Sequence, residues 1–131
     1  MYNKWGAAGA FFMALAVLSG AFGAHGLQKV IQHPSVLEPY KTAVQYLFFH
    51  GLALLVLWSV ADRISDSRIR WIFYCFFGGI LLFCGSLFLL TFSKLFQLNL
   101  SWVGGLTPVG GFLFITGWLL LAGLVWRKRR N

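Results

Sequence analysis

Four long apolar runs alternate with short polar segments along this chain. The runs cover residues 5–24, 43–61, 71–93 and 108–126, and none of them contains an aspartate, glutamate, lysine or arginine. A hydrocarbon layer about 30 Å thick takes roughly 20 residues of helix, so each run is long enough to cross it. Backbone groups in lipid must be hydrogen-bonded within their own segment, and the alternating pattern of a membrane β-strand is absent, so the runs are predicted to be helices.

Short connecting segments make successive helices antiparallel neighbours. The chain is therefore predicted to be an all-α membrane protein in which residues 1–131 form one transmembrane domain, a four-helix transmembrane bundle with up-down-up-down topology. The first run follows Lys4 and ends in small residues, as a signal peptide does, but its apolar stretch is longer than a usual signal core. We expect it to be a retained span.

The composition excludes a soluble domain, because 59% of the residues are hydrophobic, only 11% are charged and the mean hydropathy is +0.75. The formal charge of +8 comes mostly from one side of the predicted bundle. Eight basic residues lie beside the two termini and in the middle loop: Lys4, Arg63, Arg68, Arg70, Arg127, Lys128, Arg129 and Arg130. The other three are Lys29, Lys41 and Lys94. The positive-inside rule then predicts that both termini are cytoplasmic, and the basic residues are expected to meet membrane lipids rather than nucleic acid.

Aromatic and cysteine positions add detail to this topology. Four tryptophans lie at the predicted inner ends of the spans and one in the last outer loop, as an interfacial belt predicts, whereas Trp118 lies deep in the last run. Cys75 and Cys84 are nine residues apart on one predicted helix, so they lie about 13 Å apart and cannot form a disulfide with each other. The sequence has no zinc-binding spacing, and we expect no metal site.

Small residues are expected to set the contacts between the helices. Lipid provides no hydrophobic drive between spans, so close backbone approach through glycine, alanine and serine supplies packing energy instead. The glycines expected to lie at such contacts are Gly20, Gly23, Gly79, Gly85, Gly110 and Gly111.

Hydrogen-bonding side chains gather in the predicted outer half of the bundle. Thr42, Tyr46 and His50 are four residues apart and form one stripe on the second span, with Gln45 beside it. The other candidates for a ligand site or a polar network are His25, Ser86 and Thr107. Capping residues are predicted at the starts of the second and fourth spans. Ser35 and Glu38 have capping-box spacing, and Thr107 precedes Pro108 as an N-cap would.

These polar residues have two interpretations. Buried polar groups in a bilayer are costly and are functional candidates by default. Serine, threonine and histidine also serve as ordinary contacts between membrane helices, so a structural network around Tyr46, His50 and His25 explains them equally well. The functional hypothesis is a non-enzymatic membrane protein with a polar pocket in its outer half, which binds a lipid-like ligand or a partner helix as a homo-oligomer or an accessory subunit.

The residues bear on three other classes of function: a redox subunit, a small channel or transporter, and an enzyme. The first two remain as alternatives. Two imidazoles on neighbouring helices could ligate a haem iron, which would make the protein a haem- or quinone-binding redox subunit, but His25 and His50 lie at different predicted depths. No span contains a carboxylate and the inner half is apolar, which disfavours a small channel or transporter. No catalytic triad can be assembled around Glu38, the only acid on the outer side, so we expect neither an enzyme nor a cofactor.

Four segments together carry a family resemblance: GAFGAHGL (20–27), YLFFHGLALL (46–55), FCGSLFLL (83–90) and GGLTPVGGFLFITGW (104–118). With them the chain resembles the small four-span membrane proteins of bacteria that are catalogued as a domain of unknown function and have a mitochondrial transmembrane relative in animals. The resemblance covers nearly the whole chain and implies four spans in the inner membrane, without an established activity. The family pattern matches the chain at His25, Tyr46, His50, Ser86, Thr107, Pro108 and Gly111, with no role attached to them, and the loop after Lys94 is longer than the pattern implies.

Overall fold

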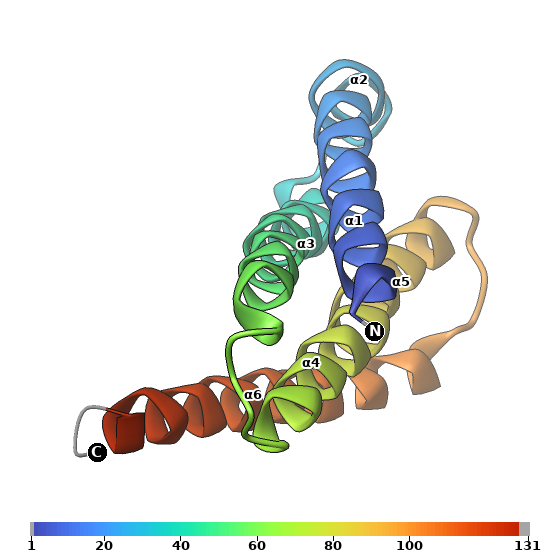
Figure 1. Cartoon of the computed structure of the whole chain (residues 1–131). Helices are drawn as coiled ribbons and strands as arrows, with labels where there is room; N and C mark the ends of the chain where they lie inside the picture. Colours follow the sequence, from blue (N-terminus) through green and yellow to red (C-terminus); the bar gives the residue numbers. More distant parts are fainter. Residues whose placement is uncertain (1, 129–131) are drawn as a thin grey trace.

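The computed structural model describes residues 2–128, and this part of the chain is helical apart from short turns (Figure 1). No strand occurs within it. The elements are α1 (Asn3–Phe22), the π-helical turn η1 (Gly23–Leu27), α2 (Gln28–Val30), α3 (Pro34–Ala61), α4 (Arg68–Gly79), the π-helical turn η2 (Ile80–Cys84), α5 (Gly85–Leu95), the 3-10 helix η3 (Ser101–Gly105) and α6 (Leu106–Lys128).

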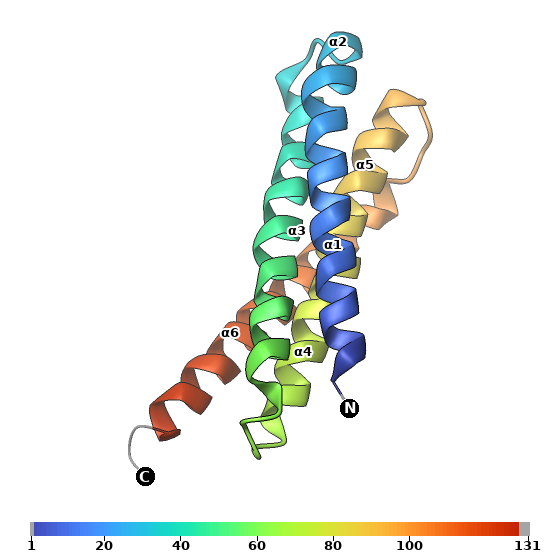
Figure 2. The same ribbon diagram turned by 45° about the horizontal axis from the view of Figure 1, so that its top comes forward.

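Four continuous helical units are long and apolar enough to cross a membrane: Asn3–Val30, Pro34–Ala61, Arg68–Leu95 and Ser101–Arg127. Each contains one of the four apolar runs, so the predicted all-α fold with four spanning helices is confirmed. The start of α1, the turn between α3 and α4, and the end of α6 lie toward one end of the molecule (Figure 2), as alternating helix directions require. The placement of this end in the cytoplasm remains a prediction.

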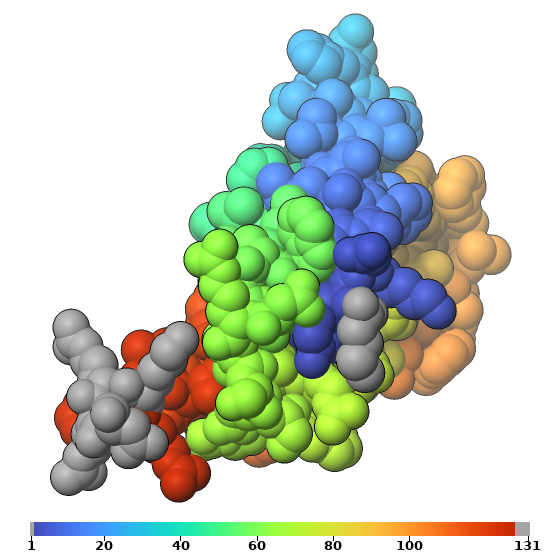
Figure 3. All heavy atoms as spheres, viewed as in Figure 1, coloured from blue at the N-terminus to red at the C-terminus, as the bar shows by residue number. Residues whose placement is uncertain are grey.

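The four units pack in chain order rather than as a closed square. The main contacts join α1 to α3, α3 to the continuous unit of α4, η2 and α5, and that unit to α6. Toward its C-terminal end α6 diverges from α3 (Figure 2), and its last turns stand out from the rest of the molecule in the space-filling view (Figure 3). Direct contacts between α3 and α6 are consequently few, and one side of α3 stays uncovered.

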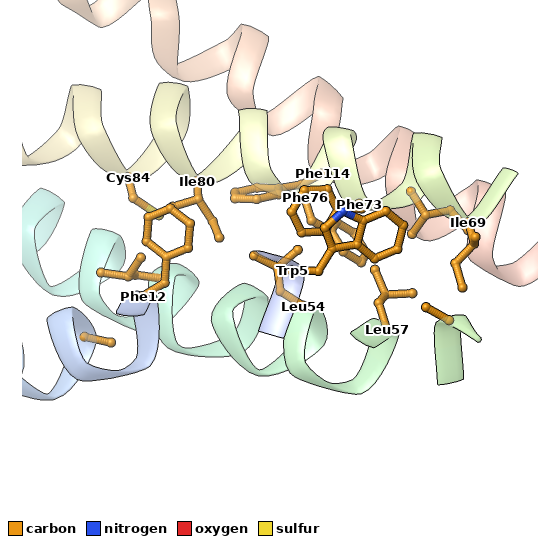
Figure 4. Packing of buried hydrophobic residues seen from close by; sticks show 14 of the residues in the cluster. Trp5, Phe12, Leu54, Leu57, Ile69, Phe73, Phe76, Ile80, Cys84 and Phe114 are labelled. Carbon is orange, nitrogen blue, oxygen red and sulfur yellow. The ribbon is translucent and has the colours of Figure 1, made fainter. Parts of the chain in front are cut away.

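The hydrophobic core lies mainly between α1, α3 and α4 (Figure 4). Trp5 of α1 stacks on Phe73 of α4, with ring centroids 4.4 Å apart and an interplanar angle of 7°. Leu54 of α3 and Phe76 of α4 are fully buried, and the ring of Phe76 also packs against Trp118 of α6. The large apolar side chains that keep α6 attached to this core are Phe114 and Leu124.

Three of the six predicted glycine contacts are close approaches between helices. A methyl group added at Gly23 would lie 2.7 Å from the ring of Tyr40, and one added at Gly110 would lie 2.7 Å from Cβ of Phe83. A methyl group added at Gly79 would lie even closer to the ring of Phe114. Carbon atoms pack best about 3.5–4.0 Å apart, so these positions have no room for a side chain.

The other three glycines lie at looser positions. A Cβ at Gly20 would lie 3.5 Å from Val44, and one at Gly111 would lie 3.7 Å from the ring of Phe83; both are ordinary contact distances. A Cβ at Gly85 would meet nothing within 4 Å, so the expected packing contact at this residue is wrong. The reason is local, because Gly85 follows directly on η2, and a π-helical turn changes the face that the next residues present.

Two predicted helix starts differ from the structure. α3 begins at Pro34 with His33 as N-cap, and no side chain caps it, so Ser35 and Glu38 do not form the expected capping box. Glu38 instead contacts Lys41, with Oε1 3.4 Å from Nζ. α6 begins at Leu106, which places Thr107 inside the first turn rather than at the N-cap.

One side-chain hydrogen bond ties α1 to α3. The hydroxyl of Tyr40 donates to the backbone carbonyl of Ser19 at 2.6 Å. We expect Tyr40→Phe to lower the free energy of unfolding by about 0.6–1 kcal/mol, the usual contribution of such a bond between membrane helices. Thermal unfolding in detergent measures this, with Tyr74→Phe as the control, because Tyr74 is 59% exposed. Equal melting temperatures for the two variants would contradict a stabilising role.

Candidate functional site

His50 lies in the middle of α3 and is almost completely buried, with 4% of its surface exposed. Its Nδ1 lies 2.8 Å from the carbonyl oxygen of Tyr46, and the indole nitrogen of Trp118 lies 3.1 Å from its Nε2. A carbonyl only accepts a hydrogen bond and an indole N–H only donates one. The imidazole is therefore neutral, with its proton on Nδ1 and its Nε2 accepting from Trp118.

Aromatic rings of α4 and α6 enclose this histidine. Phe114 stacks on the imidazole, with centroids 3.6 Å apart and an interplanar angle of 15°. Phe76 and Trp118 contact it edge-on, at centroid distances of 5.4 and 5.9 Å. His50 therefore links α3 to α6 and has no free ring nitrogen for a ligand.

A cleft lies between α3 and α6 beside His50 and has a volume of about 660 Å³. We call it the α3–α6 cleft. Most of its lining is aliphatic or aromatic, and many of these side chains are partly exposed at the side of the molecule, including Leu52 at 46% and Val56 at 56%. The lining residues are Gln45, Tyr46, Phe49, His50, Leu52, Ala53, Val56, Leu57, Val60, Trp118 and Leu121.

The α3–α6 cleft differs in character from the expected polar pocket. Its polar residues, Gln45, Tyr46 and His50, lie at one end, and from there it extends toward Val60 and Leu121. It thus runs toward the end of the bundle that holds the α3–α4 turn, beside the half of the spans that is almost wholly apolar. The cleft exists because α6 diverges from α3. The stripe of Thr42, Tyr46 and His50 does not indicate this divergence.

The remaining polar candidates do not line this cleft. Ser86 and Thr107 form a direct hydrogen bond, with their hydroxyl oxygens 2.6 Å apart, and Ser86 also donates to the carbonyl of Phe83 at 2.9 Å. This pair joins α5 to the first turn of α6. Thr42 is half-buried on α3 and lines none of the clefts described here.

The sequence predicts a hydrogen bond from His25 either to loop backbone or to the Tyr46–His50 stripe, and neither bond forms within residues 2–128. His25 lies in η1 near the end of the first span and is exposed, and its ring makes no hydrogen bond with any residue of 2–128. The imidazole of His50 is buried against α6 instead. Paired ligation of a haem iron by the two histidines therefore has no geometric basis, because the rings are not brought together and Nε2 of His50 already accepts a hydrogen bond.

Two residues of α6 that contact His50 directly were not among the candidates predicted from the sequence. Trp118 supplies the hydrogen bond to His50, and Phe114 supplies the stacked ring. The available signal was the depth of Trp118, since the other tryptophans are near predicted membrane surfaces. Within residues 2–128 no three residues among histidine, cysteine, aspartate and glutamate come together to hold a metal ion.

Comparisons with known proteins place the chain in a family. Residues 19–111, or 93 of 131, match the family model described as a protein of unknown function (DUF423). The chain is 40% identical over 114 residues to a UPF0382 membrane protein of Staphylococcus aureus (strain bovine RF122), covering 86% of this chain and 87% of the relative. It is 39% identical over 114 residues to the UPF0382 membrane protein YwdK of Bacillus subtilis (strain 168), covering 86% and 88%. No solved structure matches. By its sequence the chain belongs to the DUF423 family of membrane proteins of unknown function.

Proposed function

We propose that this integral membrane protein binds the acyl part of a membrane lipid in the α3–α6 cleft, without catalysing a reaction, and that its termini lie in the cytoplasm. The observation that carries the proposal is the cleft itself: about 660 Å³ of mainly apolar space on a spanning helix, with lining residues exposed at the side of the molecule. Sites for small molecules have volumes of about 300–1,000 Å³ and mostly apolar linings.

The dimensions of the cleft fit a lipid chain better than a partner helix. From Tyr46 to Val60 the cleft follows α3 for 14 residues, or about 21 Å, which is more than the roughly 15 Å of one hydrocarbon leaflet. A helix about 10 Å wide displaces on the order of 2,400 Å³ over a full span, several times the volume of the cleft. A flexible chain from one leaflet needs far less width.

The arrangement around His50 supports a binding role rather than catalysis. Its ring nitrogens bond to the carbonyl of Tyr46 and to the indole of Trp118, and neither group is a nucleophile or an acid that a hydrolytic mechanism uses. These contacts instead hold Trp118 at the wall of the cleft. In this proposal Tyr46, His50 and Trp118 serve both interpretations. Their hydrogen bonds join the helices, and the same bonds shape the apolar site beside them.

The test is to block the cleft and count bound lipids. Val56→Trp places a large ring in the cleft, where Val56 is 56% exposed. Native mass spectrometry of protein released from membranes is expected to show a retained lipid on the unmodified chain and a several-fold smaller lipid-bound fraction on Val56→Trp.

The matched control is Val17→Trp, the same substitution at a residue of α1 that is 61% exposed and lines no described cleft. This variant is expected to keep its bound lipid. The proposal fails if the unmodified protein carries no lipid under conditions that preserve its fold, or if both tryptophan variants retain lipid equally.

A further inference from the structure

A second cleft lies where the α3–α4 turn faces the end of α6, and its volume is about 330 Å³. We call it the basic cleft. Unlike the α3–α6 cleft, it is lined mostly by polar and charged residues, among them three arginines. Its lining residues are Arg63, Ile64, Ser65, Asp66, Arg68, Leu124 and Arg127.

The three arginines differ in their partners. Arg68 is held by Asp66, whose two carboxylate oxygens each lie 3.0 Å from its Nε, and the backbone N–H of Arg68 donates to Oδ1 of Asp66 at 2.9 Å. These bonds, together with the charges of Arg68 and of the nearby Arg127, lower the pKa of Asp66 to about 2, so the Asp66–Arg68 pair is ionised and nearly neutral as a unit at any physiological pH. Arg63 and Arg127 make no ion pair within residues 2–128 and leave the basic cleft with a positive charge.

The two clefts are consecutive along α6 and along the chain that leaves α3 at its C-terminal end. Val60 and Leu121 line the lower end of the α3–α6 cleft, and Ile64 and Leu124 line the basic cleft four and three residues further on. Leu124 lies about one helical turn beyond Leu121 on α6, whereas Ile64 lies in the α3–α4 turn, three residues after the end of α3. Both side chains are apolar, so the apolar lining continues from one cleft to the next. The charged end is expected to lie where the spans leave the membrane, because Arg127 directly follows the apolar run 108–126 and Arg63 follows the run 43–61 after Asp62.

From this continuity we propose that the lipid is an anionic phospholipid, whose phosphate group lies between Arg63 and Arg127 while its acyl chain follows α3 into the α3–α6 cleft. The inference rests on the proposed function for the position of the chain. Guanidinium groups bind phosphate oxygens through paired hydrogen bonds and hold them more specifically than a lysine does. Asp66 does not oppose this binding, because Arg68 neutralises it.

The experiment compares two lipids that differ only in charge. Purified protein in detergent is titrated with phosphatidylglycerol or with phosphatidylcholine carrying the same acyl chains, and bound lipid is counted by native mass spectrometry. The unmodified protein is expected to prefer phosphatidylglycerol about tenfold. The double variant Arg63→Gln/Arg127→Gln is expected to lose this preference and still bind phosphatidylcholine.

The matched control, Lys4→Gln/Arg70→Gln, removes the same charge from the same end of the molecule at two exposed residues outside both clefts. It is expected to keep the preference, which supports a discrete site. An equal loss in both double variants would assign the preference to general surface charge and overturn the inference. Equal binding of the two lipids by the unmodified protein would overturn the inference alone, whereas no binding of either lipid would overturn the proposed function as well.

Discussion

Gly110→Ala is expected to lower the free energy of unfolding by about 3 kcal/mol, although it adds a single methyl group. That methyl would lie 2.7 Å from Cβ and 2.8 Å from Cα of Phe83, well inside the optimal distance between carbon atoms. These atoms belong to η2 near the backbone and cannot rotate away as the end of a side chain can. Either α6 moves away from η2 or the helix distorts, and both outcomes lose the contacts that hold α6.

The neighbouring glycine provides the control for this prediction. At Gly111 an added Cβ would lie 3.7 Å from the ring of Phe83, an ordinary contact, so Gly111→Ala is expected to change stability by less than about 0.5 kcal/mol. Both residues lie in the same turn of α6 and undergo the same change in helix propensity. Thermal or denaturant unfolding in detergent measures the difference, and equal effects would contradict the close approach of α6 to η2.

His50→Ala is expected to have an effect of similar size and to lower the free energy of unfolding by about 3 kcal/mol. The substitution removes a buried ring that stacks on Phe114 and leaves the indole N–H of Trp118 without its acceptor. Because the histidine joins α3 to α6, we also expect the α3–α6 cleft to lose its shape. Lipid retention in native mass spectra should then fall together with the melting temperature.

Two further variants separate these contributions. His25→Ala serves as the control for the loss of an imidazole, since His25 is exposed, and we expect less than about 0.5 kcal/mol. Trp118→Phe keeps an aromatic ring but removes the donor, so it should lose only about 0.6–1 kcal/mol. A double-mutant cycle between His50 and Trp118 isolates their coupling. An additive result, or a His50→Ala effect as small as that of His25→Ala, would contradict the structural link.

The sequence predicts the spans well because the crossing of a membrane depends on the composition of each segment alone. The apolar run 43–61 lies within α3 for this reason. Helix ends were harder to predict, since the start of α3 at Pro34 depends on the preceding loop and no side chain caps it. The packing contact predicted at Gly85 does not form, because the π-helical turn before it changes the face that the following residues present. Regular helical spacing does not reveal such a local irregularity.

The candidate site was predicted only in part, because it depends on how the helices meet. Tyr46 and His50 were identifiable from their spacing on one span, and the structure places both at the α3–α6 cleft. Their partner Trp118 is 68 residues further along the chain, and nothing in the sequence pairs the two segments. The divergence of α6 from α3 is likewise a tertiary property. For this reason the sequence does not indicate the apolar cleft, and the shared position of His25 and His50 in the predicted outer half does not imply that their rings meet.

The most direct test of lipid binding is an experimental structure of the protein in a lipid bilayer or a lipidic crystal phase. We predict elongated density in the α3–α6 cleft beside Val56 and Leu121, continuing toward the α3–α4 turn. A cleft closed by α6 lying against α3, or filled by a helix of a second copy, would contradict the proposal that a lipid chain occupies it.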